Sequence, residues 1–202
     1  MTLAADAQLV ALDFETTGVV DDHPSVPWQI GLAFIEGGKV AETYRFTSLL
    51  NPGKRPFSPY APGRHALLRD ELAASPTLAE LWPQLAPWLA GRPLLAHNVA
   101  TERTILAEAF PIHHFGPWID TLALARLAYP RLASHRLDEL IPALGLGERM
   151  ASLCPDLGPH DALYDALAAA LLFEHLLAQP GWRATTIEEL AGACCQVGGS
   201  GR

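Results

Sequence analysis

QLVALDF, at residues 8–14, is the stretch that decides the fold of this chain. It is a nearly unbroken apolar run, and the turn sequence Thr16-Thr17-Gly18 follows it closely. A run of this length that stops at a turn is typical of a central strand covered on both faces. We therefore expect a middle strand of a sheet, with other elements packed above and below it.

The residues that follow predict two further strands joined by a tight turn. Residues 30–35 and 40–49 have the pattern of strands, and Gly37-Gly38 lies between them. A Gly-Gly pair between two such runs is a hairpin signal, so the sheet is expected to begin antiparallel. Beyond a loop rich in proline and glycine at 51–64, residues 93–96 predict a short fourth strand.

The rest of the chain is mostly helical by pattern and by capping residues. The candidate caps are Ser75-Pro76, Asn98, Asp120 and Ser134. The expected helices cover residues 66–74, 78–89, 99–110, 121–128, 136–144 and 160–178, with a short one at 185–195. A mixed sheet with these helices packed on it predicts a three-layer α/β domain.

The length and composition suit one globular domain. We assign residues 7–180 of the 202-residue chain to it, and residues 181–202 to a tail with a disordered end at 198–202. No apolar run reaches the length of about 18 residues that spans a membrane, and residues 1–10 lack a secretory signal. A cytoplasmic protein without membrane contact is therefore expected. The cysteines lack metal-ligand spacing and are expected to be reduced; they are Cys154, Cys194 and Cys195.

The net charge of −8, from 14 basic and 22 acidic residues, argues against a protein that holds long duplexes by neutralising phosphates. That objection weakens if several carboxylates bind divalent cations, because bound ions can reverse the field in a site. A cluster of carboxylates would therefore decide the question.

Two carboxylates stand at the end of the first strand. Asp13 and Glu15 are two residues apart, so strand periodicity points both side chains to one face and Phe14 to the other. An isolated Asp-x-Glu can equally mark the polar end of a strand. This pair alone therefore leaves both interpretations open.

Glu102 is a third candidate. It lies in the first turn of its expected helix, where a carboxylate is also favourable for the helix dipole. Ile105, Leu106 and Ala109 continue its row, and this apolar row must face the sheet. A carboxylate on such a row needs a metal ion or a donor as partner. Metal ligand and helix-end residue both remain open.

His160 and Asp165 come at the start of the long last helix. Asp165 shares a helix face with small residues such as Ala162 and Ala168, so it points to the core. Five residues turn a helix by about 140°, so His160 cannot face the same point from within the helix. We expect it in the loop just ahead, although a lone histidine near a helix start is commonly structural.

Together these residues form three motifs that resemble those of the DEDDh (DnaQ-like) 3′→5′ exonucleases. The motifs are Asp13-Phe14-Glu15-Thr16-Thr17-Gly18, His97-Asn98-x-x-x-Glu102 and His160-x-Ala162-x-x-Asp165. The resemblance covers about residues 8–178. The second motif departs from the pattern, since the family normally has aspartate in place of Glu102 and phenylalanine in place of Thr101. The change to glutamate keeps the charge, so activity is expected. The added methylene is expected to affect the geometry at the second metal ion.

The resemblance implies a ribonuclease-H-like fold, with a mixed β-sheet flanked by α-helices, and a metal-dependent 3′→5′ exonuclease. It implies two Mg²⁺ or Mn²⁺ ions held by Asp13, Glu15, Glu102 and Asp165, whose hard oxygen ligands suit such ions. His160 would accept the proton of the attacking water, as an imidazole can at neutral pH. The substrate would be a DNA or RNA 3′ end, single-stranded in our expectation, and the product a nucleoside 5′-monophosphate.

Four further residues are candidate substrate contacts by the same resemblance: Thr16, Thr17, Asn98 and His65. Each has a plainer interpretation, as turn residues for the two threonines and as a helix cap for Asn98. His65 stands where relatives often carry His-Gly-Ile, with Ala66 here in place of the glycine. His97 is expected to be structural.

Three rival functions remain at the level of sequence. Glu102 is the feature that favours a catalytically weak nucleic-acid-binding module. A structural part of a larger replication or repair assembly is the second. The low positive charge favours a phosphodiesterase for very short oligonucleotides, since a small substrate needs few phosphate contacts.

Overall fold

The computed structural model describes residues 2–197 and contains a five-stranded sheet in the order β3-β2-β1-β4-β5. The first three strands pair antiparallel, and β4 and β5 join them in parallel. The predicted central strand therefore lies in the middle of a mixed sheet. The strands are β1 (Leu9–Thr16), β2 (Pro27–Glu36), β3 (Lys39–Leu49), β4 (Leu94–Ala96) and β5 (Trp118–Asp120).

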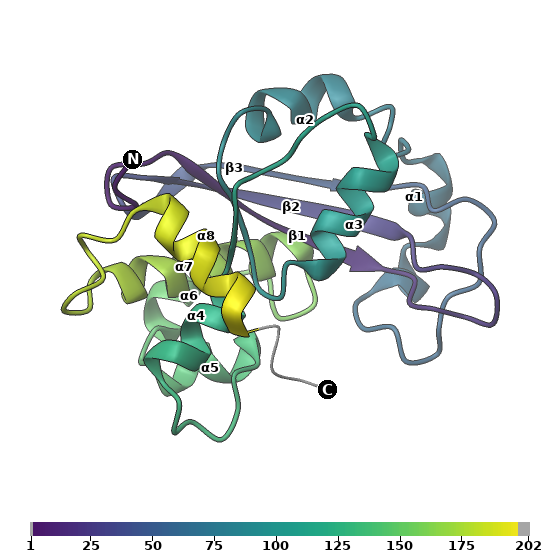
Figure 1. The fold of residues 1–202 in the computed structure, drawn as a ribbon. Helices are drawn as coiled ribbons and strands as arrows, with labels where there is room; N and C mark the ends of the chain where they lie inside the picture. Colours follow the sequence, from purple (N-terminus) through teal and green to yellow (C-terminus); the bar gives the residue numbers. More distant parts are fainter. Residues whose placement is uncertain (1, 198–202) are drawn as a thin grey trace.

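Helices cover both faces of this sheet, so the three-layer prediction is confirmed. Figure 1 shows α2 and α3 on one side and α4, α5, α6 and α7 on the other. A short 3-10 helix and α1 lie beyond the end of the sheet to which β1 points. The helices are η1 (His65–Leu67), α1 (Arg69–Ala74), α2 (Trp82–Leu89), α3 (Ala100–Ala109), α4 (Thr121–Ala128), α5 (Leu137–Ala143), α6 (Gly147–Leu153), α7 (Ala162–Leu177) and α8 (Ile187–Val197).

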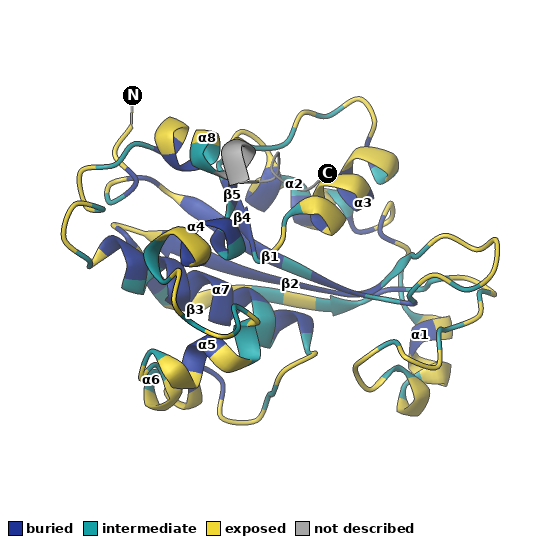
Figure 2. Ribbon diagram, turned by 60° about the horizontal axis from the view of Figure 1, so that its bottom comes forward, coloured by how far each residue is buried: buried dark blue, intermediate teal, exposed yellow. Residues whose placement is uncertain are grey.

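Side chains alternate along β1 between two separate hydrophobic cores. Leu9 and Ala11 pack with α7, whereas Val10, Leu12 and Phe14 pack with α2 and α3. Figure 2 shows β1, β2 and β4 largely dark blue between the helical layers, whereas most residues of β3 are exposed or intermediate. Continuing this alternation, Asp13 and Glu15 belong to the α7 face. The period-two pattern therefore decides which helix the two carboxylates meet.

Several predicted helix boundaries are wrong. The helix expected at 66–74 is divided into η1 and α1 at Leu68. The helix expected at 78–89 begins only at Trp82, because Thr77 and Glu80 bond to each other in a separate turn. β5 and α6 were not predicted; β5 has only three residues, which is too short for a strand pattern.

The C-terminal segment is tied into the domain. Ile187 and Leu190 of α8 are buried in the α7-side core, and α8 packs against β5 and α4. Ala4 donates from its backbone to Thr185 at 2.9 Å, which joins this segment to the N-terminus. The predicted short helix is thus present, whereas the disordered end predicted at 198–202 lies outside the described residues. Cys154 is buried and unpaired, as expected.

Among residues 2–197, no helix combines the length and the apolarity needed to cross a bilayer.

Candidate active site

The two carboxylates of β1 meet α7 because the strand beside them makes room for that helix. Asp13 is paired in register with Gly31 of β2. A Cβ atom on Gly31 would lie only 2.2 Å from the carbonyl of Ala162, the first residue of α7. Only glycine therefore lets the first turn of α7 sit directly on the sheet. This contact brings Asp165 to the end of β1.

The N-terminus of α7 is held by two residues that sequence reasoning missed. Asp161 is its N-cap and accepts hydrogen bonds from the backbone of Leu163 and Tyr164. Gln29 of β2 donates to Asp161 Oδ2 at 3.0 Å and is itself buried. The prediction that the helix begins at residue 160 is therefore wrong, because the side chain of Asp161 ends the loop. An aspartate directly before an apolar helical run was the signal available for the cap.

His160 stands in the turn ahead of α7, where the sequence placed it. Its φ of 67° turns the backbone so that its N–H donates to Asp165 Oδ2 at 3.0 Å. The possible ligand atoms of Glu15, His160 and Asp165 all lie within 4.8 Å of one another. Three residues from a strand, a loop and a helix thus converge at one point, and His160 stays exposed to solvent.

Glu102 approaches β1 from the other helical layer. Its side chain is only 4% exposed, and its Oε2 atom has no hydrogen-bond partner among residues 2–197. Burial raises the pKa of its carboxyl to about 7, and Asp120 adds repulsion, while the backbone N–H of Phe14 acts in the opposite direction. A buried carboxylate oxygen that lacks a hydrogen-bond donor needs another partner, and a bound cation would supply it.

The pKa values of the other carboxylates also favour a site for cations. Burial first, and then repulsion from Asp165, Glu102 and Glu15, raises the pKa of Asp13 well above its usual range. Burial and the charges of Asp165 and Asp161 raise the pKa of Glu15 to about 8. Burial raises the pKa of Asp165 to about 6. These carboxylates disfavour full ionisation together, and divalent cations would remove that cost.

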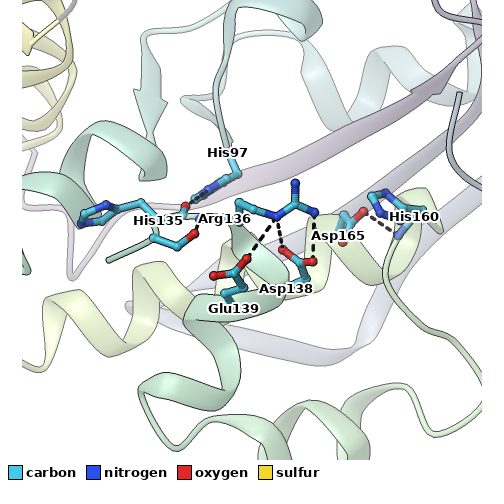
Figure 3. Close-up of polar contacts among 8 residues, drawn as sticks. His97, His135, Arg136, Asp138, Glu139, His160 and Asp165 are labelled. Atoms are coloured by element: carbon cyan, nitrogen blue, oxygen red, sulfur yellow. Dashed lines mark hydrogen bonds and ion pairs between the residues drawn. The ribbon is translucent and has the colours of Figure 1, made fainter. Parts of the chain in front are cut away.

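A cavity of about 700 Å³ opens beside the carboxylates. Asp13, His160 and Asp165 line one part of it, and Asn98 and His135 line another. In Figure 3, Arg136 with Asp138 and Glu139 lies between the pair His97 and His135 and the pair His160 and Asp165. The carboxylates therefore border a space that can admit a small ligand.

Asn98 lines this cavity and does not cap α3, so the predicted cap is wrong. The N-cap is Val99, without a capping side-chain bond, and Asn98 has a left-handed φ of 73°. Its backbone N–H donates to Asp120 Oδ1 at 2.9 Å. Asp120 also caps α4 by accepting from Leu122, as predicted.

His97 holds two elements together beneath the cavity. Its two ring nitrogens lie 3.0 Å from the hydroxyl of Thr121 and 2.9 Å from the carbonyl of His135. Burial lowers its pKa, so the neutral ring is favoured. The structural role predicted for His97 agrees with these contacts.

The remaining candidate substrate residues surround the end of β1. Thr17 is buried, and its hydroxyl bonds within its own loop, to Gly18 and Val26. Thr16 is half-buried and accepts from the Trp28 indole through its carbonyl. The contacts of Thr17 are those of a turn residue, which leaves Thr16 as the more accessible threonine.

His65 lies in η1, stacked on Phe57 with ring centroids 4.4 Å apart and edge-on to Trp28. Its Nε2 lies 3.2 Å from the carbonyl of Ala61, and its Nδ1 is buried without a partner among the described residues. His65 therefore packs beside the loop that follows β1, at the edge of the site.

Comparison with known proteins agrees with the fold and the motifs. The family model RNase_T, described as Exonuclease, matches residues 10–173. DNA polymerase III PolC-type of Thermotoga maritima is 30% identical over 172 residues, which are 83% of this chain and 12% of that protein. The 3′-5′ exonuclease DinG of Staphylococcus haemolyticus is 30% identical over 168 residues, which are 80% of this chain and 17% of that protein.

Among solved structures, Exonuclease X in complex with 5′ overhanging duplex DNA is similar over nearly its whole length. The TM-score is 0.69 at 26% identity, and the match covers 92% of this chain and 98% of that one. The chain thus spans only a small part of the two curated relatives above. It spans almost all of the Exonuclease X chain, and this match confirms the ribonuclease-H-like fold predicted from the sequence.

Proposed function

Since the chain belongs to the RNase_T exonuclease family, we propose that it is a 3′→5′ exonuclease domain that depends on divalent metal, and that five of its residues carry the reaction. They are Asp13, Glu15, Glu102, His160 and Asp165. The observation that carries the proposal is the convergence of Glu15, His160 and Asp165 within 4.8 Å. The buried, unpartnered Oε2 of Glu102 supports its inclusion.

The four carboxylates would hold two Mg²⁺ or Mn²⁺ ions. Their hard oxygens, their burial and their mutual repulsion fit such cations. When bound, the ions would stabilise negative charge on the phosphoryl group and on the leaving oxygen. The charge of Glu102 is retained relative to the aspartate usual in the family, so the fourth ligand is kept.

His160 would accept a proton from the attacking water. It is exposed at the mouth of the site, and its backbone is fixed by the bond to Asp165 at 3.0 Å. Water oxygen attacks phosphorus, the bond from phosphorus to the 3′ oxygen breaks, and that oxygen leaves with a proton. The product is a nucleoside 5′-monophosphate and a strand one nucleotide shorter.

The proposed substrate is a single-stranded 3′ end of DNA or RNA. The names of the relatives support a nucleic-acid partner, and one structural relative is itself a complex with duplex DNA bearing a 5′ overhang. Thr16, Thr17, Asn98 and His65 would contact the terminal nucleotide, since the two threonines follow the carboxylates of β1 and Asn98 lines the cavity beside Asp13. The net charge of −8 favours short oligonucleotides as the second candidate substrate class.

A panel of 3′- and 5′-labelled DNA and RNA oligonucleotides of graded length tests the proposal. Degradation should begin at the 3′ end, need Mg²⁺ or Mn²⁺, and release 5′-monophosphates. Asp13→Asn serves as the inactive control. Cleavage of a circular strand, or activity that EDTA leaves intact, would contradict it. A rate that falls steeply with length would identify the short-oligonucleotide class instead.

A further inference from the structure

The segment 54–69 is a cationic surface in an acidic protein. It contains Lys54, Arg55, Arg64 and Arg69 but neither aspartate nor glutamate. The whole chain carries a net charge of −8. Such a local excess is typical of a surface that binds a polyanion, because lysine and arginine neutralise phosphates and release the counterions condensed on them.

These four cations are not neutralised within the domain. The ion pairs among residues 2–197 belong to Arg136 and Arg149. Within the described part of the chain, Arg55 donates to the carbonyl of Pro24 at 3.4 Å, and Arg69 lies over the Phe57 ring at 4.8 Å. The positive charge of the segment is therefore available to a ligand.

The segment lies directly against the catalytic residues. Ser58 donates from its backbone to the carbonyl of Thr17 at 2.8 Å, which joins the segment to the loop after β1. A Cβ atom on Gly63 would lie 3.1 Å from the carbonyl of His160. Figure 1 shows these loops and α1 gathered at the end of β1. A ligand that occupies the catalytic centre therefore has this surface beside it.

A second cavity connects the two regions. It has a volume of about 480 Å³, and its lining includes His160, Trp28 and Arg64. Three carboxylates, Asp161, Glu71 and Asp156, also line it, so the cavity supplies space and the exposed cations of the segment supply the positive charge. A chain that leaves the catalytic centre can follow this cavity to the cationic segment.

The exposed ring of Tyr60 indicates which class of polyanion the segment can bind. Tyr60 is 92% exposed and stands among the four cations in sequence. Unpaired bases stack on such rings, and the combination of cations with an exposed aromatic is typical of surfaces for single strands.

The cavity on the other side of His160 is the weaker candidate for the same ligand. Its Arg136 forms a two-point contact with Asp138 at 3.0 and 3.1 Å and a further ion pair with Glu139, as Figure 3 shows. A phosphate would have to displace both carboxylates. The four cations of segment 54–69 form no ion pair among residues 2–197, so a phosphate would break none by binding to them.

We propose that segment 54–69 binds the sugar–phosphate backbone of a single strand as it leaves the catalytic centre. This inference rests on the proposed function and adds the path of the substrate. The segment should govern the affinity for oligonucleotides and its dependence on salt, while the carboxylates and His160 govern the chemical step.

The test compares two double variants that remove the same charge. Arg55→Gln/Arg64→Gln changes the segment, and Lys39→Gln/Arg149→Gln changes the opposite end of the sheet. KM and kcat are measured on a labelled oligothymidylate at several salt concentrations. The segment variant should raise KM roughly tenfold, change kcat far less, and lower the salt slope by about 1.4, since each single-strand phosphate contact contributes about 0.7. The control should keep the wild-type KM and slope.

Different results would contradict the proposed function and the proposed binding surface. If wild-type protein hydrolyses neither the oligothymidylate nor the p-nitrophenyl ester of thymidine 5′-monophosphate, the proposed function is wrong. If it degrades the oligothymidylate but its KM is independent of salt, the cationic segment is not the binding surface. Equal effects of the two double variants would overturn the assignment as well. Thermal melting confirms that each variant is folded.

Discussion

Glu102 is the residue at which this chain departs from the family motif, and its surroundings predict opposite effects on activity and stability. Glu102→Gln keeps the shape and removes the charge, so we expect activity to fall at least 10²-fold if the carboxylate holds metal. The same change should raise the melting temperature in EDTA at pH 8 by about 2 °C or more, because a buried carboxylate with a pKa of about 7 no longer has to ionise.

The matched control for this variant is Glu108→Gln, on the exposed side of the same helix α3. It should leave both quantities unchanged. Glu102→Asp should keep a measurable part of the activity, with a changed preference between Mg²⁺ and Mn²⁺. A Glu102→Gln protein that is fully active would remove Glu102 from the metal site.

His160 has two possible roles at its position, and one variant separates them. Its ring lies within ligand distance of Glu15 and Asp165, yet it is exposed and free to meet a water molecule. As a general base, His160→Ala should lower kcat about 10²-fold or more and change the shape of the pH–rate profile measured at saturating metal. Calorimetric metal titration should then give nearly the wild-type affinity.

His114→Ala, an exposed histidine in the loop before β5, is the control for this change and should behave as wild type. A large loss of metal affinity in His160→Ala would instead assign His160 as a ligand. A wild-type pH–rate profile would exclude it from proton transfer.

At the scale of elements, the loop that carries Gly63 supports the loop that carries His160. A Cβ atom on Gly63 would lie 2.7 Å from the Trp28 ring and 3.1 Å from the His160 carbonyl. Gly63→Ala should therefore displace the His160 turn and lower kcat by about tenfold or more, as small misplacements of catalytic groups do. Kinetics with a labelled oligonucleotide measure the effect.

Gly53→Ala separates this steric effect from backbone strain. Gly53 lies in the same loop with a similarly left-handed φ of 73°, but no atom lies within 4 Å of the position of its Cβ. It should lose some stability and keep kcat. Equal losses of kcat in the two variants would show that strain in the loop, and not contact with His160, limits the reaction.

The sequence predicted those elements whose signals are local. The apolar run before Asp13, the Gly37-Gly38 turn and the cap at Asp120 each determine their own neighbourhood, and all three are confirmed. Asp13 and Glu15 could be placed on one face because the strand period is two.

What could not be predicted depends on contacts between distant residues. Gly31 matters because Ala162 lies against it, and Gln29 matters because it bonds to Asp161; neither residue has a local motif. The approach of the Glu102 side chain to the backbone of Phe14 likewise depends on how α3 packs on the sheet. Sequence motifs therefore predicted the candidate residues of the site, whereas the packing of α7 and α3 on the sheet determined their geometry.

At the scale of the whole molecule, the carboxylate cluster should make stability depend on pH and metal together. The pKa values of Glu15, Glu102 and Asp165 are about 8, 7 and 6 in the folded protein, above those of free carboxyls. The folded state therefore binds more protons than the unfolded state. The resulting stabilisation is complete below the unfolded pKa values and is lost as pH rises through the folded ones.

In EDTA, we therefore expect the melting temperature to fall as pH rises from about 5 to 8.5, across the window set by these three pKa values. With excess Mn²⁺ the trend should reverse, because the ion binds only the ionised carboxylates and stabilises the folded state in proportion to its occupancy.

Repulsion from the net charge of −8 acts in the same direction as the cluster, so the scan is repeated in high NaCl, which screens surface charges but not buried ones. A fall that survives NaCl and becomes smaller in Glu15→Gln assigns it to the site. A melting temperature that is indifferent to Mn²⁺ at pH 8.5 would mean that these carboxylates do not hold metal.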